Sequence, residues 1–264
     1  MRYAKGSIKL SESHDYPLLR QILRCSFATH SQLCEFMRLG GHEWHRHTFT
    51  WRIRRLVQQG LVSRRTQPAI AGEQFVYSIG ASGALVLQGI GEYCLLAPGN
   101  RRKCDDDLSV RHSLELNEIH LTLLRSGVQL RWIPATDIRS QNELTTFGYA
   151  KDYDAVVEVR LSEARVVKFG LEYERTPKAE KDYRLIASRI EHETHLEHLL
   201  YLIPNHDLLS YVVRFFHRPG PRIYFGISRD WQTQLLDMPV VDASRQNRLS
   251  FREALLTNVF TLVG

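Results

Sequence analysis

Two stretches of sequence decide the fold of this 264-residue chain: Asp152-Tyr-Asp-Ala-Val-Val-Glu-Val-Arg160 and Val166-Val-Lys-Phe-Gly-Leu-Glu-Tyr-Glu-Arg-Thr176. Each has the apolar, β-branched composition of a strand. In the second stretch polar residues alternate with apolar ones. Because strand side chains alternate between two faces, Glu172 and Glu174 are expected on one face. The two stretches therefore predict neighbouring strands that carry acidic side chains.

Three carboxylates in these stretches, Asp154, Glu172 and Glu174, have spacings that suit a divalent metal ion. Two acids side by side on a strand repel each other unless a cation or a basic partner lies between them. Oxygen ligands favour Mg²⁺ or Mn²⁺ over zinc, so these residues form a candidate metal site. The alternative is the solvated polar face of an edge strand.

Composition limits the class of protein. The chain is 43% hydrophobic and 24% charged, which is enough apolar material for a folded core. No apolar run reaches the length that spans a bilayer, and the first residues lack the hydrophobic core of a signal peptide. The four cysteines form no C-x-x-C pair, which fits reduced thiols. The sequence therefore predicts a cytoplasmic protein with no membrane partner.

The first 90 residues follow the pattern of a winged helix-turn-helix. Apolar residues recur at helical spacing up to about Phe27, and Thr29 or Ser31 can cap a second helix. A third helix is expected from about His45 to Gln59, and Gly60 ends it. The remaining elements are a β-hairpin and a fourth helix, expected over 61–65, 74–78 and 84–90, with a turn over 67–73.

Arginines are concentrated in the third helix and the hairpin, where six fall within 20 residues. This density indicates a polyanionic partner, and arginine suits guanine edges and phosphate oxygens. With Phe49, Ile53 and Leu56 turned inward, the helix would enter the major groove of double-stranded DNA while the hairpin touches the backbone. The alternative is a solvated basic face on a winged helix that binds protein. The predicted DNA-binding residues are Arg46, His47, Thr50, Arg54, Arg55, Arg64 and Arg65.

A change of composition divides the chain. Residues 91–107 combine Gly and Pro with a basic run and then an acidic run, which is typical of a surface linker. The predicted domains are therefore 1–90 and 108–264, joined by that linker. In the second domain we expect a helix ending near Gly127, then strands and helices in a mixed sheet, with a polar connection over 134–147.

A charged amphipathic helix is expected over 178–198, followed by a buried strand over 199–204. His192 and His195 are three residues apart in this helix, which is a spacing of metal ligands, but the H-E-x-x-H arrangement is missing. We prefer to interpret them as a charged helix C-terminus, where imidazolium suits the helix dipole.

The order of the acidic residues resembles the PD-(D/E)xK nuclease superfamily. That motif places an Asp on one strand and a Glu on the next to hold Mg²⁺, with a Lys two residues further on. Here Asp154 and Glu172 match, but Glu174 stands at the Lys position. Lys178 or Lys181 could supply a displaced lysine. The resemblance implies a cofactor, Mg²⁺ or Mn²⁺, and a catalytic set of Asp154, Glu172, Glu174 and Lys181.

Over residues 15–235 the chain resembles the replication-relaxation family of bacterial and plasmid proteins. The resembling segments are 110–118, 153–155, 171–176 and 199–204, although Tyr153 replaces the Pro that usually precedes the first Asp. The resemblance implies an α/β (α+β) fold in which an N-terminal winged helix-turn-helix precedes a mixed-sheet PD-(D/E)xK nuclease-like domain. It also implies DNA binding connected with plasmid or mobile-element replication or its control.

Two functions follow from these patterns. In the first, the winged helix recognises DNA, and the nuclease-like domain is a scaffold, the dimerisation surface of a homodimer, or a weak metal site. In the second, the chain is an active Mg²⁺-dependent DNA endonuclease that its winged helix targets to DNA. A third alternative is an interaction module that binds no nucleic acid.

Overall fold

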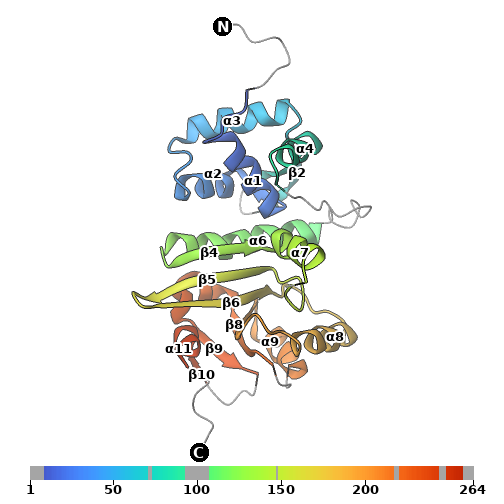
Figure 1. The fold of residues 1–264 in the computed structure, drawn as a ribbon, viewed down its shortest axis with the longest axis vertical. Coiled ribbons are helices and arrows are strands. Elements are labelled where there is room, and N and C mark those ends of the chain that lie inside the picture. Colours follow the sequence, from blue (N-terminus) through green and yellow to red (C-terminus); the bar gives the residue numbers. More distant parts are fainter. Residues whose placement is uncertain are drawn as a thin grey trace, which may run out of the picture. The chain divides into compact units, whose positions relative to one another are not determined.

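The computed structural model describes residues 9–70, 73–92, 107–146, 148–216, 220–243 and 248–257. The chain forms two compact units, Met1–Asn117 and Glu118–Gly264, and its fold class is mixed α/β, as predicted (Figure 1). The division falls within helix α6, Asp107–Arg125. Residues 93–106 lie outside the described residues, so the linker expected over 91–107 remains a prediction.

Among its described residues, the first unit has four helices and a small sheet before α6 begins. The sheet is antiparallel, with the strand order β1-β3-β2. The elements are α1 (Asp15–Cys25), β1 (Ala28–Thr29), α2 (His30–Leu39), α3 (Arg46–Gln58), β2 (Val62–Ile70), β3 (Glu73–Ile79) and α4 (Ala81–Gly89).

Local sequence signals account for these helices. Thr29 forms a capping box with Gln32: the hydroxyl of Thr29 accepts from the backbone N–H of Gln32, and the Gln32 side chain accepts from the backbone N–H of Thr29. Gly60 follows α3 at φ 70°, a left-handed conformation that costs glycine little. Between these signals, Phe49, Ile53 and Leu56 are fully buried and hold α3 against the unit's core.

The first part of α6 packs within the first unit. Val110 and Leu114 form an apolar cluster with Phe27 and Val76. The Asn117 side chain donates a 2.8 Å hydrogen bond to the carbonyl of Phe27, which lies between α1 and β1. These contacts place the side chain of Val76, and hence one face of β3, in the core.

The second unit is built on a seven-stranded sheet of order β10-β9-β8-β7-β6-β5-β4. The ladders β6–β7 and β7–β8 are parallel, and the other four are antiparallel. The strands are β4 (Gln129–Pro134), β5 (Ala155–Ser162), β6 (Arg165–Tyr173), β7 (His198–Ile203), β8 (Arg222–Ile227), β9 (Pro239–Asp242) and β10 (Arg248–Ser250). The helices are α7 (Ala135–Leu144), α8 (Glu180–Ile190), α9 (His206–Val212), α10 (Ser228–Gln234) and α11 (Phe251–Leu256), with short 3₁₀ turns at Val213–Phe215 and Leu235–Asp237.

Helices cover both faces of this sheet. On one face, Tyr201 and Phe225 of the central strands pack with residues of α7, α8 and α9, such as Ile138 and Tyr183. On the other face, Phe251 of α11 packs against Phe169 and Tyr224 of the sheet. Because both faces are covered, β7 is buried along its whole length, as its continuous apolar sequence predicts.

Three elements differ from the sequence predictions. The expected polar connection over 134–147 contains helix α7, whose one fully buried residue, Ile138, gives almost no apolar periodicity. Helix α8 ends at Ile190, so His192 and His195 follow the helix and the expected helical run to 198 is wrong. Strand β2 extends to Ile70, into the expected turn. Among the described residues, no helix is both long and apolar enough to cross a membrane.

Candidate functional site

Helix α3 uses different sides for different purposes. Its core side carries Phe49, Ile53 and Leu56. A second side carries Arg52 and Arg55, which are three residues apart and face α1. A third carries Arg46, Thr50 and Arg54, which recur every four residues and so form one stripe. The arginines of one helix therefore have two different environments.

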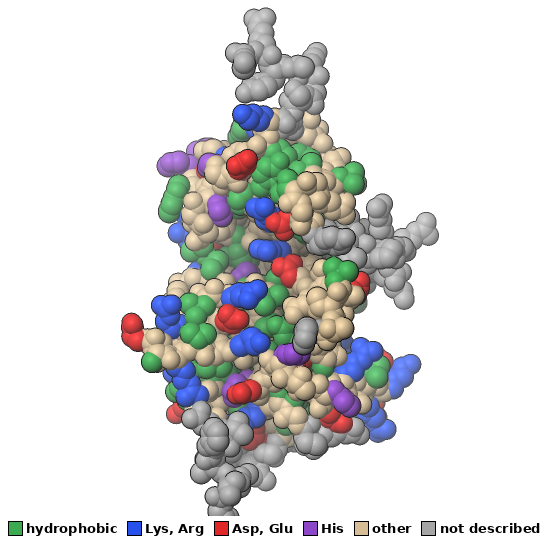
Figure 2. All heavy atoms as spheres, in the orientation of Figure 1, with side chains coloured by type: hydrophobic (Ala, Val, Ile, Leu, Met, Phe, Trp, Pro, Cys, Tyr) green, Lys and Arg blue, Asp and Glu red, His purple; other side chains and the backbone are tan. Residues whose placement is uncertain are grey.

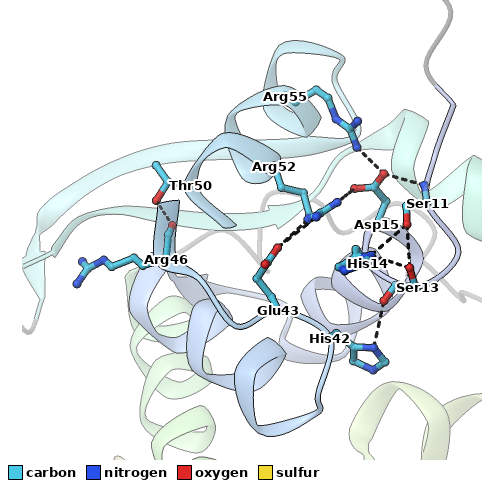
Figure 3. Close-up of polar contacts among 10 residues, drawn as sticks. All are labelled: Ser11, Ser13, His14, Asp15, His42, Glu43, Arg46, Thr50, Arg52 and Arg55. Carbon is cyan, nitrogen blue, oxygen red and sulfur yellow. Dashed lines mark hydrogen bonds and ion pairs between the residues drawn. The ribbon is translucent and has the colours of Figure 1, made fainter. Parts of the chain in front are cut away.

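The second side of α3 belongs to a buried ion-pair network, which we call the Asp15 cluster: Asp15, Glu43, Arg52 and Arg55 (Figure 3). Arg52 Nη1 donates to Asp15 Oδ1 at 2.9 Å, and Arg52 Nε donates to Glu43 at 3.2 Å. Arg55 donates to the other oxygen of Asp15. The carboxylate of Asp15 is fully buried, and a guanidinium fork satisfies it at each oxygen.

The pKa of Asp15 reflects this network. Burial alone would raise it, but the backbone N–H of Ser11, which donates at 2.8 Å, and the guanidinium groups of Arg52 and Arg55 outweigh burial. The pKa of Asp15 is therefore held below its ordinary value of 3.8. The Asp15 cluster stays ionised, and it ties α1 to α3.

The predicted DNA-binding residues on α3 fall into two groups. Arg46, His47 and Arg54 are exposed, and Figure 3 shows Arg46 pointing away from the Asp15 cluster. Thr50 is partly buried and donates a 2.8 Å hydrogen bond to the carbonyl of Arg46. Arg55, by contrast, is bound to Asp15. The structure therefore places Arg46, His47, Thr50 and Arg54 at the surface of α3, whereas Arg55 belongs to the Asp15 cluster.

The two predicted hairpin arginines lie on opposite faces of β2. Arg64 pairs with Tyr77 across the β2–β3 ladder, and Arg65 pairs with Val76, which is buried in the core. Since directly opposite residues share a face, Arg64 lies on the face of Tyr77 and Arg65 on the face of Val76. Arg65 forms a 3.2 Å ion pair with Asp107 of α6.

In the second unit, Asp154, Glu172 and Glu174 meet where β5 begins and β6 ends. We call these three residues the acidic cluster. Asp154 precedes Ala155, which pairs with Leu171, so strand alternation places Asp154 and Glu172 on one face. An oxygen of Asp154 accepts a 2.7 Å hydrogen bond from the backbone N–H of Tyr173, the residue between the two glutamates.

Two lysines form ion pairs with the glutamates of the acidic cluster. Lys151 Nζ lies 2.5 Å from Glu172 Oε1, and both side chains are about nine-tenths buried. Lys178 forms an ion pair with Glu174 and is itself more exposed. Lys181, the predicted displaced lysine, is exposed on α8, where it follows Glu180. The structure therefore pairs the acidic cluster with one of the two lysines considered from the sequence, Lys178, and with one that was not, Lys151.

The pKa values of the glutamates are shifted upward. Burial raises the pKa of Glu172 to about 7, which Lys151 opposes and the charge of Asp154 reinforces. Burial also raises the pKa of Glu174, which Lys178 opposes. Tyr201, the register partner of Glu172 on β7, has a buried hydroxyl that makes no hydrogen bond within the described residues. The acidic cluster thus holds more negative charge than its neighbours fully stabilise.

The fit of a divalent metal can be judged from these contacts. Carboxylate oxygens are suitable ligands, and among the described residues the Glu172 oxygen beside Lys151 finds an ion pair but no aligned hydrogen bond. However, each glutamate already holds a lysine ammonium group. Within the described parts of the chain, no group of three or more His, Cys, Asp or Glu residues is arranged to hold a metal ion. As they stand, the residues do not fit a preformed metal centre.

Several residues of these sites were missed from sequence. Arg52 is a buried partner of both Asp15 and Glu43, and the only sequence signal for this network is that Arg52 lies next to the apolar face of α3. Glu193 accepts hydrogen bonds from the Tyr153 hydroxyl at 2.9 Å and from the N–H of Ala150 at 3.0 Å, which fixes the backbone leading to Asp154. No local pattern indicates a contact across 40 residues.

The histidines predicted at a helix C-terminus have different roles. His192 Nδ1 lies 2.9 Å from the carbonyl of Ser188, in the last turn of α8. His195 packs its ring edge-on to Tyr149. His192 therefore contacts the end of the helix from outside it, and these histidines do not form the helical metal-ligand pair considered from the sequence.

The fold and its charged sites define a protein of two α/β units, with a basic surface helix in the first unit and a buried acidic cluster in the second. The chain belongs to the replication-relaxation family, whose family model matches residues 19–199. This confirms the resemblance seen in the sequence, and membership suggests a role in the replication of plasmids or mobile elements. Comparison with curated proteins and with solved structures gave no match.

Proposed function

We propose that the chain is a duplex-DNA-binding protein and that its first unit is a winged helix that carries the binding surface. The order of elements supports this: a short strand between α1 and α2, then α3, then the β2–β3 hairpin. In this arrangement α3 is the helix that enters the major groove.

The observation that carries the proposal is the division of the arginines. Arg52 and Arg55 are used to hold the unit together, whereas Arg46 and Arg54 on α3 and Arg64 on β2 are exposed. A stripe of exposed arginines is what a phosphate backbone requires. On the face in view, Figure 2 shows the Lys and Arg side chains of the second unit interspersed with Asp and Glu.

Fluorescence anisotropy with a labelled duplex tests the proposal. If three exposed arginines contact phosphates, affinity should fall about 40-fold between 50 and 200 mM salt, since each contact contributes about 0.9 to the log–log slope. Changing Arg54 and Arg64 together to Gln should reduce the slope by about 2. Arg38→Gln, which removes one exposed arginine in the last turn of α2, is the control for loss of a positive charge outside the proposed surface and should leave the slope unchanged. Affinity that does not depend on salt would refute the proposal.

The second candidate function is a metal-dependent endonuclease that acts through the acidic cluster. The upward-shifted pKa values of Glu172 and Glu174 favour it, because such shifts are common at catalytic sites. A divalent ion would have to displace the ammonium groups of Lys151 and Lys178. Nicking of supercoiled plasmid in Mg²⁺ or Mn²⁺, abolished by Asp154→Ala, would establish this function. Equal nicking by both proteins would eliminate the acidic cluster as its source.

A further inference from the structure

A cleft of about 230 Å³ opens in the first unit between α3 and the β2–β3 hairpin. It draws its walls from the first residue of α2, the exposed stripe of α3 and one face of the hairpin. The lining includes His30, Thr50, Arg54, Arg64, Phe75 and Tyr77. The sequence indicated basic residues on these elements but gave no sign that they enclose a space.

The hairpin wall follows from strand register. Arg64 and Tyr77 are directly opposite, and Phe75 lies two residues from Tyr77, so all three side chains share a face. The Arg64 guanidinium lies 4.6 Å from the centroid of the Phe75 ring, a cation–π contact that holds the charge at the edge of the cleft. This wall is therefore aromatic, with a fixed cation above it.

The helical wall comes from Thr50, Ile53 and Arg54, which occupy adjacent positions on α3. The hydroxyl of Thr50 donates to the carbonyl of Arg46, so its 3.2 Å contact with His30 Nε2 requires His30 to donate. Burial lowers the pKa of His30; Glu73 opposes this shift, and Arg46 and Arg54 add to it. Because the lowered pKa favours the neutral form of His30, the charges of the cleft come from its arginines and Glu73.

The charge balance favours an anion. Glu73 is the acidic residue of the lining, and its carboxylate accepts hydrogen bonds from the N–H groups of His30 at 3.1 Å and Ser31 at 3.3 Å. These N–H groups begin α2, where the helix dipole stabilises negative charge. Glu73 is thus partly neutralised at the helix, which leaves the guanidinium groups of Arg54 and Arg64 in excess.

The size of the cleft limits what can enter. Its 230 Å³ is below the roughly 300–1,000 Å³ of pockets that take drug-sized ligands. It is equivalent to about eight water molecules at ~30 Å³ each. A single phosphate with part of the sugar or base attached to it is a suitable occupant, and a dinucleotide cofactor is too large.

We propose that this cleft is a nucleotide subsite, which takes one phosphate between Arg54 and Arg64 and places the attached sugar or base against Phe75 and Tyr77. This inference rests on the proposed DNA-binding function and specifies one contact of it. The phosphate comes either from a DNA strand or from a free nucleotide. Arginine forks match phosphate geometry, and aromatic faces accept any base or sugar without sequence preference.

The test titrates the full chain with deoxyadenosine monophosphate. Binding is monitored through the backbone NMR signals of His30 and Gln74 at the cleft. We expect saturable shifts in the wild type and at least a tenfold weaker affinity after Arg54→Gln with Arg64→Gln. Both arginines are exposed, so the variant should fold. The variant Arg54→Lys with Arg64→Lys keeps the charge but loses the fork, and should give an intermediate affinity. Arg38→Gln is the control for loss of a positive charge outside the cleft and should bind as the wild type does.

Duplex anisotropy, with and without the mononucleotide, separates the outcomes. Competition identifies the DNA strand as the occupant, whereas cleft shifts without competition identify a free nucleotide. If the duplex binds but the mononucleotide gives no saturable shift at the cleft, or shifts the glutamine double variant equally, the subsite is refuted and the proposed function stands. If the mononucleotide binds but the duplex does not, the proposed function fails and the cleft remains a nucleotide site.

Discussion

Each unit buries acidic side chains beside basic ones, but the electrostatic result is opposite in the two. In the Asp15 cluster, the pKa of the buried carboxyl is lowered, because Ser11 and two guanidinium forks compensate for burial. In the acidic cluster, the pKa values of Glu172 and Glu174 are raised, because Lys151 and Lys178 do not. Burial alone therefore does not distinguish a structural ion pair from a candidate reactive site.

The difference lies in how completely each acid is bound. Arginine offers a planar fork that can bind two carboxylates at once, as Arg52 binds Asp15 and Glu43. Lysine is a point charge, and within the described residues the Glu172 oxygen beside Lys151 makes an ion pair but no aligned hydrogen bond. An acid bound at every oxygen stabilises a fold, whereas an acid whose charge is only partly compensated is available to bind a proton, a cation or a substrate.

The largest effect should follow from Asp15→Asn. This change removes the charge that compensates buried Arg52, and breaking a buried pair typically costs about 3 kcal/mol or more. Hydrogen exchange at the amides of Leu19 and Ile22 in α1 would report the loss as faster exchange. Asp107→Asn breaks the exposed pair with Arg65 and should cost about 1 kcal/mol or less. If the two variants behave alike, the Asp15 cluster has no structural importance.

A smaller effect is expected in the acidic cluster. Replacing both members of the buried pair, Lys151→Met with Glu172→Gln, should be neutral or stabilise the second unit by about 1 kcal/mol, because both charges lose their desolvation cost. Lys151→Met alone should destabilise it, since Glu172 is left buried and uncompensated. Urea unfolding followed through buried Trp231 measures both. A double variant less stable than the single one would show that the pair is structural after all.

The smallest effect concerns pH. The pKa of Glu172 is raised above its ordinary 4.5, so its contribution to stability is complete below pH 4.5 and is lost as pH rises towards about 7. The pKa of Asp15 is lowered below 3.8, so its contribution is present above pH 3.8 and is lost as pH falls through the lowered value. Carboxyl ¹³C titration should therefore show a midpoint near 7 for Glu172 and one below 3.8 for Asp15. Two ordinary midpoints would remove the contrast between the clusters.

The strength of the local signal decides which elements the sequence predicts. The elements with strong local signals were placed well: the capped α2, α3 ending before Gly60, and the continuous apolar strand β7. Helix α7 was missed because it buries a single residue, Ile138, fully. Helical periodicity needs a repeated apolar position, and one such residue cannot supply it.

The site residues, too, differ in whether a local pattern in the sequence reveals them. Alternation predicts that Glu172 and Glu174 leave their strand on one face. Applied to β2, it also separates Arg64 from Arg65, which the sequence interpretation assigns to one DNA-contacting group. The lysine that pairs with Glu172 could not be found, because Lys151 comes from a loop and its contact depends on how β5 and β6 pair. Partners brought together by tertiary structure leave no periodic signal in the chain.

The two-residue strand β1 has a consequence for the order of folding. It completes the small sheet by pairing Ala28 with Tyr77 and Thr29 with Val76, residues almost fifty positions apart in sequence. Loops of that length close slowly compared with the growth of a helix, so α1, α2 and α3 can form before the sheet is closed. We expect pulse-labelled hydrogen exchange to protect the helical amides before those of the β1–β3 ladder. If the helical amides and those of the β1–β3 ladder are protected simultaneously, the cleft and the helices that support it form in one step.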